Sequence, residues 1–296
     1  MKNTLVLGFP EYDDAARRLA KASDADYQLI EIHHFPDGES LVRLPPDRLP
    51  SQVIFCRSLD RPNDKLVELM LAAESARNRG VRQITLVVPY LCYMRQDKAF
   101  RPGEAVSQHI IGKWLAGLFD KIITVDPHLH RTPELGLALP QTEAISLSAT
   151  SLLGDFLKQQ VNDALLVGPD EESAQWVQQI ANAAGFPFVV AKKQRQGDRR
   201  VEIKLPAFDY AGKSVVLVDD VVSTGQTMLT AARQLKSVGA AEVHCLVTHP
   251  VFCDEATELF KSAGVDNLWS SDSIPHVTNV VQLASLLAEA VTQEQK

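Results

Sequence analysis

The sequence predicts an α/β fold made of two similar domains, each a mainly parallel sheet flanked by helices. Short apolar runs typical of buried strands recur along the chain, at 4–8, 27–32, 52–56, 84–90, 121–126, 143–147, 164–168, 187–191, 214–220 and 242–249. Helical patterns separate most of them, at 64–80, 109–119 and 173–185. In each half a helix that ends in glycine, Gly80 or Gly185, precedes a strand. We therefore expect one domain over residues 1–145 and a second over 146–296.

Two segments depart from this alternation. Residues 32–44 are strand-like but contain Pro36-Asp37-Gly38, which is a turn signal, so they predict a β-hairpin. Residues 192–206 are charged, contain Gly197 and lack a helical apolar stripe. The second segment predicts a mobile loop that leads into a short strand.

Composition limits the class of protein. The 296 residues are 45% hydrophobic and carry a formal net charge of −7, which indicates a globular protein and argues against nucleic acid as the main partner. The sequence offers no apolar stretch long enough for a bilayer and its N-terminus turns acidic early, so we expect a cytoplasmic protein. The cysteines lack metal or redox spacing and are expected to be reduced; they are Cys56, Cys92, Cys245 and Cys253.

The run 214–220 ends on two adjacent carboxylates, Asp219 and Asp220, and a small polar loop follows. Ligands of parallel sheets bind beyond the carboxyl ends of strands, where helix N-termini favour anions. The loop supplies hydroxyl donors and a glycine, which suits a phosphate; its residues are Ser223, Thr224, Gly225, Gln226 and Thr227. Carboxylates beside a phosphate suit sugar hydroxyls or Mg²⁺ placed between them. The alternative is a capped helix with solvated acids.

Other polar segments follow predicted strands in the first half. Residues 87–104 contain Arg95, Gln96 and Asp97, and this cluster suits a polyphosphate or a purine base unless it is only a solvated loop. Asp126, His128 and His130 occupy alternate positions after the run 121–126. These favour Mg²⁺ with phosphate oxygens over zinc, because no fourth zinc ligand lies nearby.

The second half has two further candidates. Asp170 follows the run 164–168 and suits a sugar hydroxyl, although capping of the next helix explains the segment equally well. Lys192, Lys193 and Arg195 suit a segment that folds over a transferred phosphoryl group; ordinary surface charge is the alternative.

Six motifs in order and spacing resemble the ribose-phosphate pyrophosphokinases, which have the type I phosphoribosyltransferase fold. They are FPDGE (35–39), PYLCYMRQDKAFRPGEAVS (89–107), TVDPHLH (124–130), VGPDEES (167–173), KQR (193–195) and DDVVSTGQT (219–227). The resemblance covers residues 1 to about 290. It implies two phosphoribosyltransferase-like domains and transfer of the diphosphoryl group of ATP to the 1-hydroxyl of ribose 5-phosphate, with Mg²⁺. The products are AMP and phosphoribosyl pyrophosphate (PRPP).

The resemblance also implies a role for each matched residue. The 5-phosphate is bound by Ser223, Thr224, Gly225, Gln226 and Thr227, and the ribose by Asp219, Asp220 and Asp170. ATP is bound by Arg95, Gln96, Asp97 and His128, and the metal by His128, Asp170 and Asp126. Phe35, Asp37 and Glu39 match a turn that reaches the adenine of a neighbouring subunit, which implies a homodimer or a higher oligomer. Lys193 and Arg195 match the catalytic pair.

Three questions stay open at this point. RQDKAFRPGE (95–104) resembles the shorter class III enzymes, and the chain ends soon after the helical segment 280–291, so the hexamer and phosphate activation of longer relatives are not expected. A phosphoribosyltransferase would use the same sugar loop without the RQD and FPDGE segments. A regulatory relative without catalysis would show damage in the acid pair or the KQR segment, and both are intact.

Overall fold

The computed structural model describes residues 4–129, 132–196, 200–252 and 255–292, and the side chains of 193–202 lie outside this description. The chain forms two compact units. One comprises Met1–Leu147, Ser273–Pro275 and Leu283–Lys296, and the other comprises Ser148–Asp272 and His276–Gln282. Each unit contains a parallel sheet flanked by helices, which confirms the predicted α/β fold class. Cys253, one of the four cysteines expected to be reduced, falls outside the described residues, and the other three are buried thiols that form no disulfide.

The sheet of the first unit has six strands in the order β2-β1-β5-β6-β7-β8, all parallel. The strands are β1 (Leu5–Gly8), β2 (Asp26–Leu29), β5 (Gln52–Cys56), β6 (Gln83–Val87), β7 (Lys121–Val125) and β8 (Glu143–Leu147). The helices are η1 (Pro10–Tyr12), α1 (Asp13–Ala22), α2 (Pro62–Asn78), α3 (Ser107–Ala116), α4 (Leu135–Ala138) and α9 (Ala284–Thr292). Leu7, Phe55 and Leu86 pack in one cluster with Leu69 of α2 and Leu115 of α3. Burial of these strands explains their continuous apolar runs.

The sheet of the second unit has the order β10-β9-β13-β14-β15-β16, again parallel. Its strands are β9 (Leu165–Gly168), β10 (Phe188–Val190), β13 (Ser214–Val222), β14 (Glu242–Pro250), β15 (Asn267–Ser271) and β16 (Asn279–Val281). Its helices are α5 (Thr150–Gln160), η2 (Glu171–Ser173), α6 (Ala174–Ala184), α7 (Gln226–Ser237) and α8 (Ala256–Ser262). Leu217 and Val247 pack with Leu229 of α7 and Phe260 of α8 in one core.

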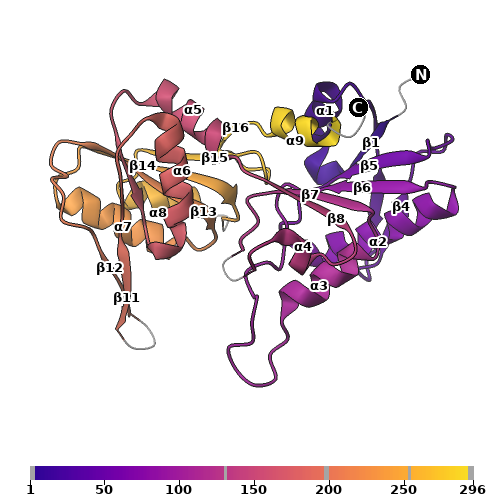
Figure 1. Ribbon diagram of the computed structural model, residues 1–296, viewed down its shortest axis with the longest axis horizontal. Coiled ribbons are helices and arrows are strands. Elements are labelled where there is room, and N and C mark those ends of the chain that lie inside the picture. The colour runs from indigo at the N-terminus through magenta and orange to yellow at the C-terminus, as the bar shows by residue number, and fades with distance from the viewer. Residues whose placement is uncertain (1–3, 130–131, 197–199, 253–254, 293–296) are drawn as a thin grey trace. The chain divides into compact units, whose positions relative to one another are not determined.

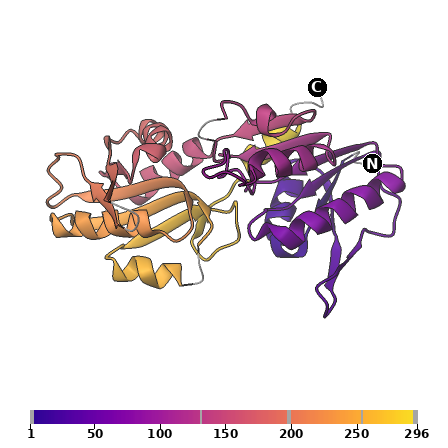
Figure 2. The same cartoon turned by 90° about the horizontal axis from the view of Figure 1, so that it is seen from below.

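A hairpin lies outside each six-stranded sheet. β3 (Glu31–His34) and β4 (Ser40–Arg43) pair antiparallel around the turn 35–39, as the sequence predicts. Figure 2 shows this hairpin projecting from the first unit in dark purple. In the second unit β11 (Lys192–Gln196) and β12 (Arg200–Lys204) form an extended antiparallel pair (Figure 1). The expectation of a loop before one short strand was therefore wrong, because residues 192–196 pair with the alternating segment that follows.

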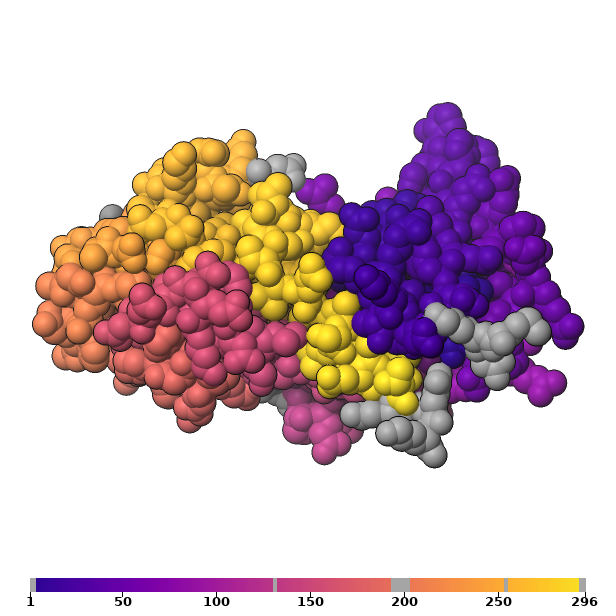
Figure 3. All heavy atoms as spheres, turned by 90° about the horizontal axis from the view of Figure 1, so that it is seen from above, coloured from indigo at the N-terminus to yellow at the C-terminus, as the bar shows by residue number. Residues whose placement is uncertain are grey.

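The C-terminal helix belongs to the first unit. α9 packs against α1, and Figure 3 shows the yellow helix beside the indigo N-terminal segment. Its buried residues are Leu287, Ala288 and Ala290. The sequence predicts a second domain that contains all residues after 145, whereas α9 belongs to the first unit. The difference arises because an apolar helix face indicates burial without indicating which core covers it.

Candidate active site

Three carboxyl groups gather at the carboxyl edge of the second sheet. Asp170 follows β9, while Asp219 and Asp220 lie in the neighbouring strand β13. Burial and the charges of Asp220 and Asp170 raise the pKa of Asp219 well above its ordinary value of 3.8. Asp170 and Asp220 are themselves 7% and 2% exposed. Grouped acids of this kind favour a cation, or a ligand that donates hydroxyl groups.

The acid pair lies within the strand rather than after it. β13 continues through Val222, with Asp219 opposite Val247 and Val221 opposite His249 on β14. The amide of Asp220 donates a hydrogen bond of 3.0 Å to Oδ1 of Asp219. The strand ladder therefore fixes the backbone that carries both carboxylates, which makes the acid edge rigid.

Asp170 caps the helical turn that follows it, which is one of the two interpretations that the sequence left open. Its Oδ1 accepts a 3.1 Å hydrogen bond from the amide of Glu172, so it caps η2. Its carbonyl accepts a 2.7 Å bond from the hydroxyl of Ser173. The capping reading is correct, and the same cap holds the carboxylate near Asp219.

The loop after β13 requires glycine at one position. Gly225 has φ of +69°, and a Cβ built there would lie 2.8 Å from the ring of Phe260. The loop residues Ser223 and Thr227 are half-buried, whereas Thr224 and Gln226 are exposed. α7 begins at Gln226, and its N-cap residue is Gly225, which makes no side-chain cap bond. The start of a helix favours an anion such as a phosphate.

The first unit carries its candidate residues on loops after β6 and β7, which are neighbouring strands. Arg95 is exposed, and Gln96 and Asp97 are half-buried. The carbonyl of Gln96 accepts a 3.2 Å bond from the amide of Gln108, and its Oε1 accepts a 3.3 Å bond from the hydroxyl of Ser107. These contacts fix the segment to the start of α3.

Asp126 has an unusual backbone. Its φ is +38°, its side chain is 7% exposed, and its amide donates a 2.8 Å bond to the carbonyl of Leu147. A non-glycine residue in this region stores strain of about 1–3 kcal/mol, which is typical of ligand-binding positions. His128 is half-buried, and His130 lies outside the described residues.

The predicted metal ligands are divided between the units: Asp126 and His128 in the first, Asp170 in the second. Within the described ranges, no three or more His, Cys, Asp or Glu side chains are grouped in a way that would hold a metal ion.

The turn 35–39 is exposed at the tip of the β3–β4 hairpin. Phe35 is 41% exposed, and its ring lies edge-on to His33 with 4.8 Å between centroids. Asp37 accepts a 3.1 Å bond from the amide of Glu39, whose own side chain is exposed. An aromatic ring and two acids presented to solvent suit a ligand outside this unit's own core.

Lys193 and Arg195 occupy alternate positions of β11, opposite Ile203 and Val201 of β12. Their side chains lie outside the described residues, so their predicted contact with a ligand stays a prediction. Lys192, the first residue of β11, is exposed.

Sequence analysis missed a buried ion pair between Arg57 and Glu68 in the first unit, with exposures of 2% and 1%. The signal was an arginine placed directly after the apolar run 52–56.

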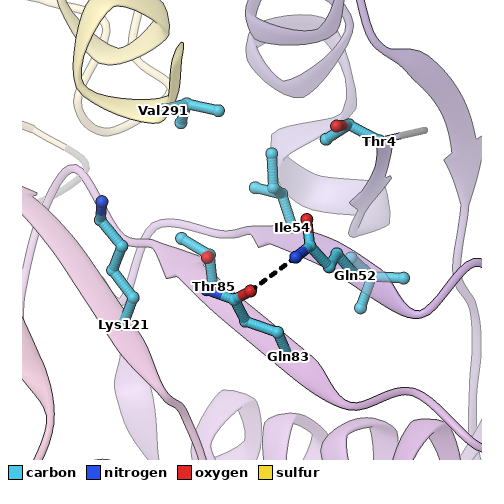
Figure 4. Close-up of a pocket in the computed structure, with 8 residues that line it drawn as sticks. Thr4, Gln52, Ile54, Gln83, Thr85, Lys121 and Val291 are labelled. Carbon is cyan, nitrogen blue, oxygen red and sulfur yellow. Dashed lines mark hydrogen bonds between the residues drawn. The ribbon is translucent and has the colours of Figure 1, made fainter. Parts of the chain in front are cut away.

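A cavity of about 200 Å³ lies at the opposite, amino edge of the first sheet (Figure 4). Gln52 donates a 2.8 Å bond to Gln83 beside it, and Lys121 extends along one side. Because ligands of such sheets bind at the carboxyl edge, this cavity is not the candidate site.

Comparison with known proteins identifies the family. Residues 5–118 match the N-terminal domain of ribose phosphate pyrophosphokinase, and residues 138–285 match the phosphoribosyl transferase domain. Ribose-phosphate pyrophosphokinases of Methanopyrus kandleri and Methanosarcina acetivorans are 34% and 32% identical, over 97% of this chain and 98% of each relative. The chain belongs to the ribose-phosphate pyrophosphokinase family. This membership confirms the predicted family and the prediction of an enzyme that forms PRPP.

A solved member of the family shares the fold. The crystal structure of phosphoribosylpyrophosphate synthetase from Mycobacterium smegmatis superposes with a TM-score of 0.84, at 24% identity over 98% of both chains. Within the described residues, no helix of this chain is long and apolar enough to span a membrane.

Proposed function

We propose that this chain transfers the diphosphoryl group of Mg-ATP to the 1-hydroxyl of ribose 5-phosphate. The sugar oxygen attacks the β-phosphorus, the bond between that phosphorus and the α,β-bridging oxygen breaks, and AMP leaves. The hydroxyl proton is lost, and the product is PRPP. The transferred unit passes intact, so both phosphoryl groups come from one ATP.

The observation that carries the proposal is the acid cluster near a loop that leads into the N-terminus of a helix, α7. Asp170, Asp219 and Asp220 present acceptors for ribose hydroxyls, and the amides at the start of α7 present donors for the 5-phosphate. A sugar phosphate has both kinds of group at opposite ends. The arrangement therefore favours ribose 5-phosphate over a free phosphate or a free sugar.

Mg²⁺ fits the donor chemistry of these residues. Burial, and after it the charges of Asp220 and Asp170, raise the pKa of Asp219. A bound cation would offset both effects, and carboxylate oxygen is the ligand that Mg²⁺ prefers. The assignment of the metal to Asp170, Asp126 and His128 rests on the family resemblance alone. Mg²⁺ supplies neutralisation of the phosphate charge when it is bound.

ATP is assigned to the Arg95-Gln96-Asp97 segment and His128. The contacts of Gln96 with Ser107 and Gln108 fix this segment, which lowers the entropy lost on binding. Lys193 and Arg195 are assigned to the charge that develops on the transferred group, because cations act on the rate only when they contact the transition state.

The exposed turn with Phe35, Asp37 and Glu39 is assigned to the adenine of a neighbouring subunit. This assignment requires a homodimer or a larger homo-oligomer. An aromatic ring that is 41% exposed on a projecting hairpin supports it, because burial against a second chain would remove that ring from water.

The test is direct. Purified protein is incubated with Mg²⁺, ATP and ribose 5-phosphate, and the nucleotides and PRPP are measured by chromatography. We expect AMP and PRPP in equal amounts, with neither formed when ribose replaces ribose 5-phosphate. Failure to form both products, or release of a nucleoside monophosphate from PRPP and a free base, would contradict the proposal.

A further inference from the structure

The β3–β4 hairpin depends on support from the rest of its unit. It is a sheet of two strands and pairs with neither edge of the six-stranded sheet. Isolated two-stranded hairpins are marginally stable in water. The turn 35–39 is exposed throughout, so among the described residues nothing packs over it. Whatever fixes its direction must act at the base.

The turn itself is internally fixed. The amide of Phe35 donates a 2.8 Å bond to the carbonyl of Glu39, and the amide of Gly38 donates a 2.9 Å bond to the carbonyl of Phe35. The Asp37 carboxylate accepts a third hydrogen bond, from the amide of Glu39. A turn held in this way moves as one body, and its direction follows the last pair of residues beneath it.

That last pair is bonded to a buried carboxylate. His34 and Ser40 are cross-strand partners directly below the turn. The Ser40 hydroxyl donates a 2.9 Å hydrogen bond to Oε1 of Glu68 on α2. Nδ1 of His34 lies 3.2 Å from Oγ of Ser40 and 3.6 Å from the same carboxylate oxygen. The base of the hairpin is therefore hydrogen-bonded to α2 through Glu68.

Glu68 is itself held firmly. Its Oε2 accepts from Nη2 of Arg57, while Nε of Arg57 donates a 2.6 Å bond to Glu11. Nη1 of Arg57 donates a 3.0 Å bond to the carbonyl of Lys65. The Glu68 side chain is 1% exposed and that of Arg57 is 3% exposed. Buried ion pairs contribute little net stability compared with apolar residues, so a role in fixing geometry explains this pair better.

We infer that Glu68 is a positioning residue that orients the Phe35–Glu39 turn for ATP binding through its hydrogen bond with Ser40. The inference rests on the proposed function, because it assumes that the turn contacts ATP. Glu68 fixes the last cross-strand pair, and that pair fixes the direction of the turn. A competing account holds the hairpin only by apolar packing, since Ile32 and Val42 contact the core of the unit.

The test removes the hydrogen bond and leaves the packing. Ser40→Ala keeps the Arg57–Glu68 pair intact, whereas Glu68→Gln would leave Arg57 buried without a full counter-charge and endanger folding. Ser40→Thr retains the hydroxyl and serves as the rescue. Arg43→Ala is the matched control, because Arg43 lies at the other end of β4 in an exposed ion pair with Glu31.

Two measurements are made on these full-length variants. Hydrogen exchange of the amides of residues 35, 38 and 39 should become about tenfold faster in Ser40→Ala, because a hydrogen bond to a charged group is lost. The KM for ATP should rise about fivefold while the KM for ribose 5-phosphate stays within about twofold, since only ATP contacts the turn. Ser40→Thr and Arg43→Ala should match the parent enzyme in both.

Unchanged exchange in Ser40→Ala would overturn the inference in favour of apolar packing alone. Faster exchange with an unchanged KM for ATP would overturn the link to ATP binding. A failure of the proposed function is seen separately, because the parent enzyme would then form no PRPP in the same assay.

Discussion

After burial and the charge of Asp220, the charge of Asp170 contributes to raising the pKa of Asp219, although Asp170 follows β9 and Asp219 lies within β13. Neighbouring parallel strands bring their carboxyl ends to one edge, and the cap of η2 fixes Asp170 there. The cluster therefore stores repulsion that a ligand relieves. A site of this kind binds its ligand at the expense of the stability of the empty protein.

Replacement of Asp219 should reveal how much this carboxyl group destabilises the empty protein. A carboxyl group whose pKa is raised on folding keeps its proton after the unfolded chain has lost it. Stability therefore falls as the pH rises from the unfolded pKa of about 3.8 through the raised folded value. Asp219→Asn does not titrate, so its melting temperature should exceed the parent's by about 2–4 °C at pH 7 and match it near pH 3. Calorimetry across pH checks this, and a lower melting temperature at pH 7 would contradict it.

Gly225 tests the geometry of the phosphate loop. Gly225→Ala combines a strained φ of +69° with a clash against Phe260, so we expect a loss of about 2–3 kcal/mol in stability and at least a tenfold rise in the KM for ribose 5-phosphate. Gly239→Ala is the control, because its φ is +90° but its nearest neighbours lie 3.6 Å away. It should lose about 1–2 kcal/mol and leave KM unchanged. If the two variants changed the KM for ribose 5-phosphate equally, the assignment of the 5-phosphate to this loop would be contradicted.

Lys193 and Arg195 test the assignment of the catalytic pair. Lys193→Ala and Arg195→Ala should each lower kcat by about 10²–10³ and leave both KM values within about threefold. Lys192→Ala should do much less, because strand alternation turns neighbouring residues to opposite faces. Steady-state kinetics of the three variants decides the matter. An equal loss at Lys192 would mean that these cations attract ATP without acting on the reaction step.

Mixed oligomers test the shared site. If Phe35 completes the ATP site of a neighbour, Phe35→Ala and Lys193→Ala subunits should each be nearly inactive alone and recover activity after subunit exchange. Each mixed pair would then contain one site with both residues intact. Exchange is verified by mass spectrometry, and no recovery in verified mixtures would place Phe35 in its own subunit's site or in none.

The sequence predicts the central strands well because their burial leaves apolar runs, but β15 and β16 are not predicted. The predicted ends of the strands are less accurate. The run 27–32 divides into β2 and β3 at the buried residue Ile30. β2 belongs to the six-stranded sheet, whereas β3 belongs to the hairpin. Asp219 and Asp220 read as the end of a strand, yet backbone pairing continues past them to Val222. Hydropathy reports burial, whereas strand length follows backbone hydrogen bonds.

Sequence motifs also locate the residues of the candidate site better than the residues that hold them in position. The acid pair lies near the end of β13, the loop and Asp170 follow strands, and all of them carry recognisable chemistry. Glu68 lies inside a helical pattern, where one acid resembles any surface acid, and its partners Ser40 and Arg57 come from other elements. α9 was placed with the wrong unit for the same reason, because contacts between distant segments leave no local signal.

The most direct test of the account concerns Asp220, which is 2% exposed and assigned to the ribose hydroxyls. Asp220→Asn keeps the shape and loses charge-assisted hydrogen bonds, each of which contributes about 1.5–3 kcal/mol. The KM for ribose 5-phosphate should rise about ten- to a hundredfold while the KM for ATP stays within about threefold. Asp163→Asn, an exposed acid just before β9, should change neither. An equal rise of both KM values in Asp220→Asn would contradict the assignment of this edge of the sheet to the sugar phosphate.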